Sequence, residues 1–347
     1  MKSQFKTCLA FCVAVFVLSA PVRAAPVTIA LVPVGDPGNL PDTNTGSLHG
    51  AVSYSYNIGK YDVTIAQYCA FLNSVAATDT YSLYSPSMAT DLNVAGISQS
   101  GVSGSYTYSV IGSGQRPITY VTWYDAARFS NWLTNGQGSG GTETGVYNLN
   151  GSNPFLSLPA DHSSLIGTGT KWFLPTDDEW YKAAYYKGGN TNAYWTYPFK
   201  SNTQPTANAA PGGSNSANFL NHGVFAVTQS ASFSSSQNYL TDVGAYSSAL
   251  SPYGAYDMGG DVNQWNETGF VNELSSYRKE RGGYWHQGSS ELVSTFAADG
   301  PPTSNGNYLG FRVAELPEPS TVTLFALGTI GVWFAGRRRR GDSLAKK

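Results

Sequence analysis

Cysteine is scarce in this sequence, with three in 347 residues. Two of them, Cys8 and Cys12, lie in an apolar run near the N-terminus. If that run is removed during export, Cys69 is the only thiol of the mature protein, and an intramolecular disulfide is excluded. Because Cys69 falls on the apolar face of a predicted helix, we expect a buried thiol and not a nucleophile.

Basic residues are scarce as well once the two ends are set aside. Residues 25–316 contain 11 lysines and arginines against 20 aspartates and glutamates, and hence carry a net charge of −9. An acidic body without a basic stripe does not suit the phosphate backbone of nucleic acids. We therefore expect no nucleic-acid partner.

The common catalytic motifs are absent too. The sequence has no Gly-x-Ser-x-Gly, no His-Glu-x-x-His and no phosphate-binding loop ending in Gly-Lys-Ser/Thr. Its four histidines are too far apart to show a metal-ligand spacing. The carboxylates of Asp177, Asp178 and Glu179 fall in the first turn of a predicted helix. Acids there bind free N–H groups, so we interpret all three as structural.

The N-terminus has the pattern of a secretory signal. Lys2 and Lys6 precede an apolar run from residue 8 to residue 18, and small residues lead up to Ala24. We predict cleavage after Ala24, so that residues 1–24 are a signal peptide. A membrane anchor is the alternative, but the apolar run is short for a span.

The C-terminus combines a Pro-Glu-Pro motif, an uncharged stretch over residues 320–336 and a cluster of arginines. The residues of the two flanking motifs are Pro317, Glu318, Pro319, Arg337, Arg338, Arg339 and Arg340. The uncharged stretch would form a helix of about 25 Å, near the lower limit for crossing a bilayer. We predict a membrane helix over residues 320–336 with the arginines in the cytoplasm. A buried core helix is the alternative, which the arginines disfavour.

This arrangement over residues 315–347 resembles the PEP-CTERM sorting tail of Gram-negative bacteria. The resemblance implies that an exosortase-type enzyme recognises the tail and processes it during export. It also implies a body outside the inner membrane, either anchored by the helix or released to the cell surface or extracellular matrix.

Between the two ends, Gly, Ser, Asn, Thr and Tyr dominate, a composition typical of an irregular, loop-rich exported domain. Three segments nevertheless begin like helices, with a threonine and a polar partner three residues later: Thr64 with Gln67, Thr122 with Asp125, and Thr176 with Glu179. Residues 74–115 and 201–238 have turn-forming composition and little apolar periodicity, so we interpret them as loops. The sequence predicts a single irregular α+β domain.

Six short motifs occur in order along this body: Tyr61 to Thr64, Pro117 to Val121, Phe173 to Thr176, Tyr256 to Trp265, Arg281 to Gly283, and Gly310 to Val313. Over residues 54–314 they resemble the formylglycine-generating enzyme, or sulfatase-modifying factor, family. The resemblance implies one irregular α+β domain related to C-type lectins, with little regular secondary structure, after a lead-in at residues 25–53.

Enzymes of this family oxidise a sulfatase cysteine to formylglycine, using copper(I) held by two cysteines that follow an Arg-Gly-Gly-Ser motif. Here Gln287 and Leu292 occupy the two cysteine positions, and Tyr284 replaces the serine. Amide and aliphatic side chains cannot substitute for two thiolates around a soft ion. The resemblance therefore implies a domain without copper and without this oxidase activity.

The family also has a structural calcium site in the segment from residue 256 to residue 265. Its ligands here would be two side chains and two carbonyls, all oxygen donors as calcium prefers: Asp257, Gly260, Val262 and Gln264. Gln264 replaces the family's glutamate, so weaker binding is expected. A hydrogen-bonded turn without an ion is the alternative. For a second family site only Asn218 and Phe219 match, and the required acid is missing.

The former active-site face is the predicted ligand surface, with aromatic and polar side chains suited to sugars or peptides: Tyr284, Trp285, His286, Gln287 and Glu291. Partners of that kind are an extracellular polysaccharide or a surface protein. Core packing is the alternative for Trp285. Two other functions stay open: an enzyme with an unrecognised site at His286 and Glu291 or Asp299, and a body that serves only as a spacer.

Overall fold

The computed structural model describes residues 26–44, 49–149, 151, 161–189, 191–272 and 275–316. The expected signal peptide, the Pro-Glu-Pro motif, the expected membrane helix and the arginine cluster lie outside these residues. Within the described part, no helix is both long and apolar enough to span a bilayer.

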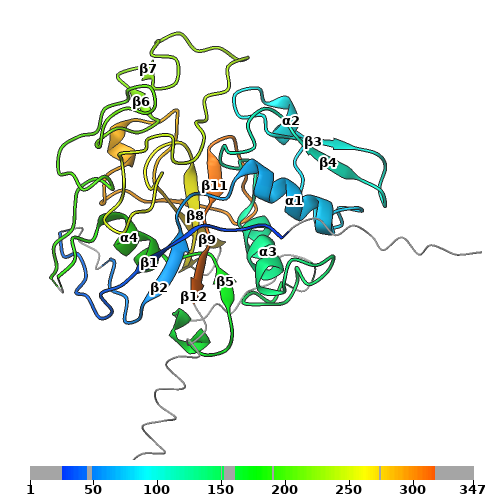
Figure 1. Ribbon diagram of the computed structural model, residues 1–347, viewed down its shortest axis with the longest axis horizontal. Coiled ribbons are helices and arrows are strands. Elements are labelled where there is room, and N and C mark those ends of the chain that lie inside the picture. Colours follow the sequence, from blue (N-terminus) through cyan, green and yellow to red (C-terminus); the bar gives the residue numbers. More distant parts are fainter. Residues whose placement is uncertain are drawn as a thin grey trace, which may run out of the picture.

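The first four-stranded sheet joins segments from opposite ends of the chain. Its strand order is β1-β2-β12-β5, formed by Leu31–Val34, Tyr56–Gly59, Ala314–Leu316 and Lys171–Phe173. All three pairings are antiparallel. Strand β1 lies within residues 25–53, expected from the sequence to be a lead-in, and pairs with β2 along its whole length. The sheet therefore builds this segment into the body of the protein (Figure 1).

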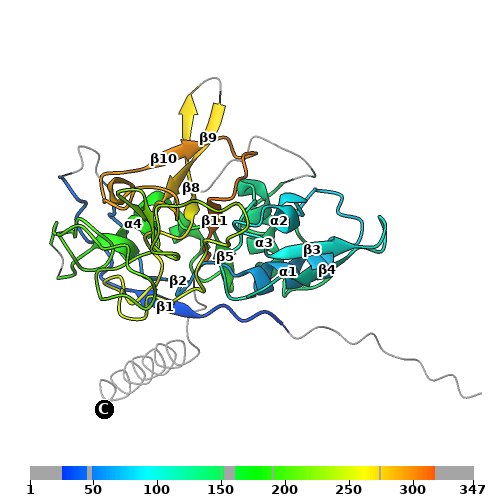
Figure 2. The ribbon, with the colours of Figure 1, turned by 90° about the horizontal axis from the view of Figure 1, so that it is seen from above.

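The second four-stranded sheet carries the segment where the candidate site begins. Its order is β10-β9-β8-β11, formed by Ala298–Gly300, Ser275–Arg281, Asn263–Asn272 and Leu309–Phe311. Strands β8 and β9 form a long antiparallel hairpin with an irregularity between Trp265 and Gly269. Figure 2 shows the far end of this hairpin standing out from the body. The near end, at Arg281, lies in the interior.

The three helices begin where the sequence predicts. They are α1 (Ile65–Val75), α3 (Trp123–Thr134) and α4 (Asp177–Tyr185), and each has a complete capping box on the expected threonine. Each box satisfies backbone N–H groups that have no partner inside the helix. Helices α1 and α3 lie to one side of the central strands and α4 to the other (Figures 1 and 2).

The two segments interpreted as loops differ in the structure. Residues 74–115 contain a short helix, α2 (Ser87–Thr90), and a hairpin of β3 (Ile97–Ser100) with β4 (Thr107–Val110). The loop interpretation of this segment is wrong, because strands of four residues are too short to show a clear alternation. Residues 201–238 contain only the two-residue strands β6 (Leu220–Asn221) and β7 (Val224–Phe225). Two single 3₁₀ turns, η1 (His162–Leu165) and η2 (Ser289–Glu291), complete the described elements.

Aromatic side chains fill the core between these elements. Phe71 of α1 meets Phe129 and Trp132 of α3 at ring-centroid distances of 5.4 and 5.3 Å. Cys69 on the same helix is 5% exposed, which confirms the expected buried thiol. Short strands and helices packed around such a core make an α+β fold with little regular secondary structure, as expected.

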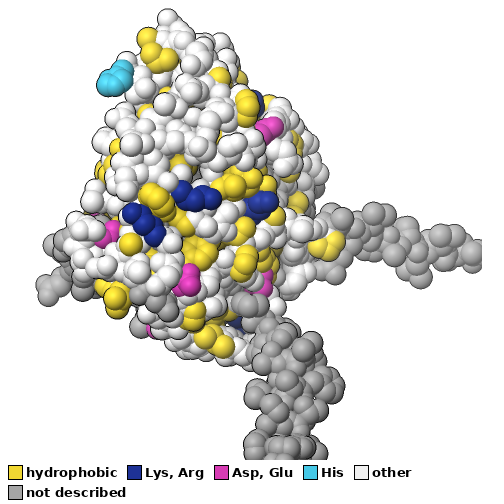
Figure 3. Space-filling view, turned by 60° about the vertical axis from the view of Figure 1, so that its left-hand side comes forward, with side chains coloured by type: hydrophobic (Ala, Val, Ile, Leu, Met, Phe, Trp, Pro, Cys, Tyr) yellow, Lys and Arg dark blue, Asp and Glu magenta, His cyan; other side chains and the backbone are white. Residues whose placement is uncertain are grey.

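The surface is mostly uncharged, and two of its lysine side chains lie against aromatic rings. On the face shown in Figure 3, the Lys and Arg side chains gather near the middle among hydrophobic ones. The ammonium group of Lys60 lies 5.5 Å from the ring centroid of Tyr61 and 5.4 Å from that of Tyr256. That of Lys187 lies 4.2 Å from the Trp195 ring. Cation–π contacts of this length are attractive, so the rings help to fix these side chains.

A charged histidine is buried at the junction of α4 and the second sheet. The His162 side chain is fully buried, with Nδ1 3.0 Å from Glu179 and Nε2 3.1 Å from Glu267. Burial opposes protonation of the ring, but the two carboxylates outweigh it and raise the pKa of His162 to about 10. His162 also holds the pKa of Glu179 below its ordinary value against the effect of burial. The imidazolium thus bridges two acids that would otherwise repel each other.

This bridge predicts a loss of stability in alkaline solution. Because the folded protein raises the His162 pKa, the stabilisation is complete below its ordinary value of 6.5 and is lost as the pH rises through about 10. His162→Gln should lower the free energy of unfolding by about 3–5 kcal/mol at neutral pH, the usual cost of breaking a buried ion pair. The substitution should also make the free energy of unfolding less dependent on pH between pH 6.5 and 10.

Urea unfolding of the purified protein at several pH values measures both effects. His222→Gln is the matched control, because His222 is exposed on the β6–β7 turn. An unchanged alkaline slope in the His162 variant would show that the bridge carries no charge.

Candidate ligand-binding site

The site is a loop, residues 282–297, between β9 and β10. Gly282 and Gly283 open the loop with φ of 107° and 70°, values that favour glycine. A Cβ at Gly283 would also approach Leu292 to 2.8 Å. The two glycines of the Arg-Gly-Gly motif therefore turn the chain sharply away from the sheet.

The preceding residue, Arg281, fixes both ends of this loop. Its Nε and Nη2 donate to the two oxygens of Asp177, in the first turn of α4, at 2.7 and 3.0 Å. Its Nη1 donates to the carbonyls of Ser294 and Phe296, where the chain returns to β10. One buried guanidinium thus joins the sheet, the helix and the returning loop.

Gln287 and Leu292, which the family resemblance assigns to the positions of two cysteines, have different surroundings. Leu292 is fully buried in an apolar cluster with Phe199, and its carbonyl accepts the hydroxyl of Tyr185 at 3.2 Å. Gln287 is partly exposed, and its backbone carbonyl accepts the N–H of Leu220 at 2.8 Å. The side-chain Oε1 of Gln287 is buried and has no hydrogen-bond partner. The loop thus keeps its shape with no thiol in it.

Trp285 belongs to the core and not to the surface. It is 2% exposed, and its indole N–H donates to the carbonyl of Asn307 at 3.2 Å. The prediction that Trp285 is part of the ligand surface is therefore wrong, and the core-packing alternative holds for this residue. The other members of the predicted ligand surface are exposed or half-buried: Tyr284, His286, Gln287 and Glu291.

Four rings lie nearly parallel beside the loop. The Trp285 ring is stacked on Tyr239 at 4.8 Å and 4°, and on His286 at 4.9 Å and 11°. Phe233 is stacked on Tyr239 at 5.7 Å and 8°, and on His286 at 5.9 Å and 5°. Tyr239 and Trp285 are buried, whereas Phe233 is 53% exposed and His286 is also exposed. The sequence does not predict Phe233 and Tyr239 as members of this site, because their Ser-rich loop shows no periodic pattern.

The acids expected beside His286 do not pair with it. Its ring contacts are with Phe225, Phe233 and Trp285. Asp299 lies on β10, where it pairs with Lys279 at 3.6 Å. Within the described residues, no hydrogen bond joins His286 to Glu291 or Asp299. The geometry of a histidine general base oriented by a carboxylate is therefore not formed here.

The predicted calcium ligands differ in availability. The Oε1 of Gln264 accepts hydrogen bonds from Trp180 at 2.6 Å and from Arg312 at 2.7 Å, and its Nε2 donates to the Asp257 carbonyl at 2.8 Å. Both acceptor positions of this amide are in use, so the side chain serves the core and not an ion. Asp257 accepts one hydrogen bond, from the Gly244 N–H at 2.7 Å.

A second carboxylate lies on the same small pocket as Asp257. Asp261 shares this pocket with Asn218 and accepts hydrogen bonds from Thr241 and Asn218. Burial raises the pKa of Asp257 to about 6 and that of Asp261 to about 7. The nearby positive charge therefore does not offset the effect of burial on these two carboxyl groups.

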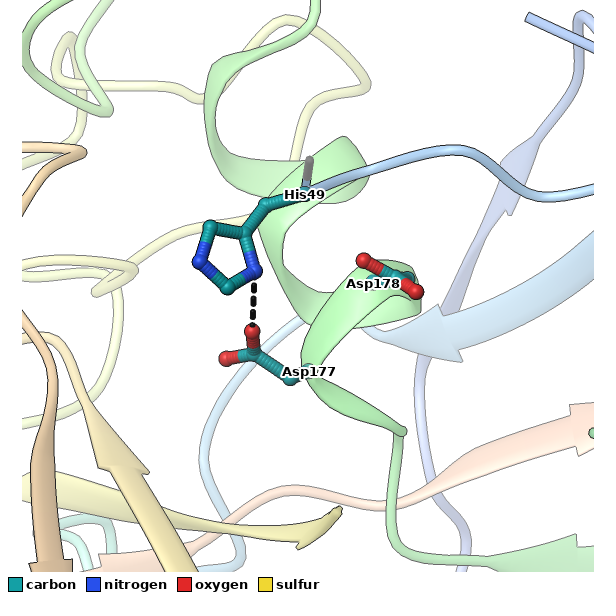
Figure 4. Close-up of side chains that lie close together, drawn as sticks. All are labelled: His49, Asp177 and Asp178. Atoms are coloured by element: carbon teal, nitrogen blue, oxygen red, sulfur yellow. Dashed lines mark ion pairs between the residues drawn. The ribbon is translucent and has the colours of Figure 1, made fainter. Parts of the chain in front are cut away.

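A candidate metal-binding group lies at the start of α4. His49, Asp177 and Asp178 each place a donor atom within 4.8 Å of the others (Figure 4). Nδ1 of His49 is 2.8 Å from Asp177, and Asp178 accepts the Gly50 N–H at 2.7 Å. Burial raises the pKa of Asp177, but His49 and Arg281 outweigh it and lower the pKa well below its usual range. The protein itself thus supplies the positive charge. No pattern links His49 to Asp177 in the sequence, because 128 residues separate them.

Comparisons with known proteins agree with the two resemblances. Residues 27–316 match the profile of the sulfatase-modifying factor enzyme 1-like domain. Residues 315–340 match the PEP-CTERM protein-sorting motif, which implies export, processing by an exosortase and sorting to the cell surface. No curated protein sequence matches this chain.

Solved structures with a similar chain course include three of low sequence identity. CarF aligns over 83% of this chain and 98% of its own, with a TM-score of 0.49 and 20% identity. Treponema denticola variable protein 1 aligns over 84% of this chain and 96% of its own, with a TM-score of 0.41 and 19% identity. PvdO from Pseudomonas aeruginosa aligns over 84% of this chain and 92% of its own, with a TM-score of 0.43 and 18% identity. Because the profile matches residues 27–316, the chain belongs to the family of proteins with a sulfatase-modifying factor enzyme 1-like domain.

Proposed function

We propose that this protein is a non-catalytic binding module displayed outside the inner membrane by its sorting tail. The observation that carries the proposal is the fully buried Leu292 at the second cysteine position. Copper(I) at this place would need a soft ligand, and an aliphatic side chain packed among other apolar groups offers none. Cys69, the only cysteine outside the predicted signal peptide, is buried on α1.

The exposed part of the loop is the proposed contact surface. It consists of Tyr284, His286, Gln287 and Glu291, of which His286 is one of the four parallel rings, and the partner is an extracellular polysaccharide or a surface protein. The mixture of aromatic, amide and carboxylate side chains on this surface supports the role, because such groups stack on and hydrogen-bond sugars or peptides.

A structural calcium ion is part of the proposal, with one change in its ligands. Asp257 and the carbonyls of Gly260 and Val262 are kept, and the carboxylate of Asp261 replaces the amide of Gln264. The proximity of the two carboxylates supports this assignment, since Asp257 adds to the effect of burial in raising the pKa of Asp261. A hard cation is favoured by two carboxylates and carbonyl oxygens.

The first test concerns copper. The purified protein should retain less than about a tenth of an equivalent of copper(I) in the presence of a competing chelator, because the loop has no thiolate. It should also leave a sulfatase-derived cysteine peptide unoxidised. Cys69→Ala is the control, since it removes the only cysteine outside the signal and shows whether residual copper is bound there. Retention of about one equivalent by this control would overturn the non-catalytic assignment.

The second test concerns calcium. Saturating calcium should raise the free energy of unfolding, by about 2.7 kcal/mol at one hundred times Kd. Asp257→Asn should abolish the increase, whereas Asp242→Asn, on an exposed residue near Gly244 in the sequence, should keep it. Thermal unfolding with calcium or with a chelator measures the difference. An equal response of both variants would rule out Asp257 as a ligand.

A further inference from the structure

We infer that the two exposed rings of Phe233 and His286 form a platform for a pyranose ring of a neutral glycan. This inference rests on the proposed binding function and specifies its ligand. Sugars present a C–H face that packs on aromatic rings, and hydroxyl groups that need hydrogen-bond partners. The four parallel rings and their polar neighbours offer both.

The two exposed rings have a fixed orientation relative to each other. The planes of the Phe233 and His286 rings are nearly parallel, with an interplanar angle of 5° and ring centroids 5.9 Å apart. Each is stacked on a buried ring of the inner pair, Tyr239 or Trp285. An exposed phenylalanine whose ring is held by stacking on a buried ring presents an apolar surface of defined orientation. A phenylalanine on a free loop would instead sample many rotamers.

The loop that carries Phe233 is fixed from beneath by a buried side chain. Asn93 is 7% exposed and its amide donates to the carbonyls of Ser234 and Gln237 at 2.8 and 2.9 Å. The backbone carbonyl of Asn93 accepts the N–H of Tyr239 at 2.8 Å. The Tyr239 hydroxyl in turn accepts the N–H of Ser234 at 2.8 Å. Binding a ligand here would therefore order little protein, which lowers the entropic cost of association.

Polar groups surround the rings, and the segments that carry the rings contain almost no charged residue. Residues 226–240 contain no charged residue, and residues 284–291 contain Glu291 alone besides His286. Exposed serines flank Phe233, and the half-buried Gln287 follows His286 in the chain. These hydroxyl and amide groups match sugar hydroxyls, and the acidic body, at −9 over residues 25–316, disfavours an anionic polymer.

The size of the platform favours a glycan over a folded protein. Stable protein interfaces bury about 800 Å² on each partner, much more than the faces of two rings. A single sugar ring, in contrast, needs only one or two aromatic faces. A protein partner is therefore an outcome that the test must detect and not the ligand that we assign.

The experiment is a binding screen with the purified protein against immobilised glycans. The panel holds neutral glucans, galactomannans and chitin oligosaccharides, together with uronic-acid polymers as an anionic comparison. We expect binding to at least one neutral glycan, insensitive to salt. Phe233→Ala and His286→Ala should each weaken that binding about tenfold, in line with the loss of a stacking contact.

The matched control is Tyr277→Ala, which removes an exposed ring on β9 and should leave the affinity unchanged. Unfolding curves of all three variants establish that each is folded. Binding only to uronic-acid polymers, no binding to any neutral glycan, or equal losses in Phe233→Ala and Tyr277→Ala would each overturn the assignment. Capture of a protein by the same surface would overturn it as well. These outcomes are separate from the copper result, which decides the non-catalytic function by itself.

Discussion

The buried ion pair of Arg281 with Asp177 is the interaction on which the candidate site depends. It connects the end of β9 to the first turn of α4, and the remaining guanidinium nitrogen holds the carbonyls of Ser294 and Phe296. The negative charge of Asp177 is favoured at the start of a helix, and His49 supplies a further partner. Removing either member would leave an uncompensated buried charge, a loss of about 3–5 kcal/mol. The loop between these anchor points is therefore shaped from its ends.

This arrangement explains how the loop keeps its shape without the two cysteines. Gly282 and Gly283 set its direction, Arg281 fixes its return, and Leu292 fills an apolar cluster in its middle. A leucine buries more apolar surface than a cysteine, so this position now contributes to packing. The ion pair and the two glycines therefore maintain the shape of the loop without a contribution from a thiol.

Local patterns were readable from the sequence, and contacts between distant segments were not. The sequence predicts Thr64, Thr122 and Thr176 as helix caps because a cap and its partner lie three residues apart. Glu179 shows the limit, since its capping role is local but its pairing with His162 depends on the fold. Phe233 gave no signal in a serine-rich loop, and the burial of Trp285 follows from Tyr239 and Asn307, 46 residues before and 22 after it in the chain. The sorting tail and the family motifs were recognisable because each is a contiguous pattern.

The aromatic face lies where two independently fixed loops meet. Trp285 and His286 belong to the loop held by Arg281, whereas Phe233 and Tyr239 belong to the loop held by Asn93. The stacked rings join these two loops, so the orientation of the exposed pair is set by two anchors that lie beneath the surface. The hydrogen bonds of Arg281 and Asn93 go to backbone groups and to Asp177 and not to the exposed rings, so substitution of Phe233 or His286 would leave both anchors in place. The exposed rings can therefore vary while the buried guanidinium and amide groups that maintain the two loops stay the same.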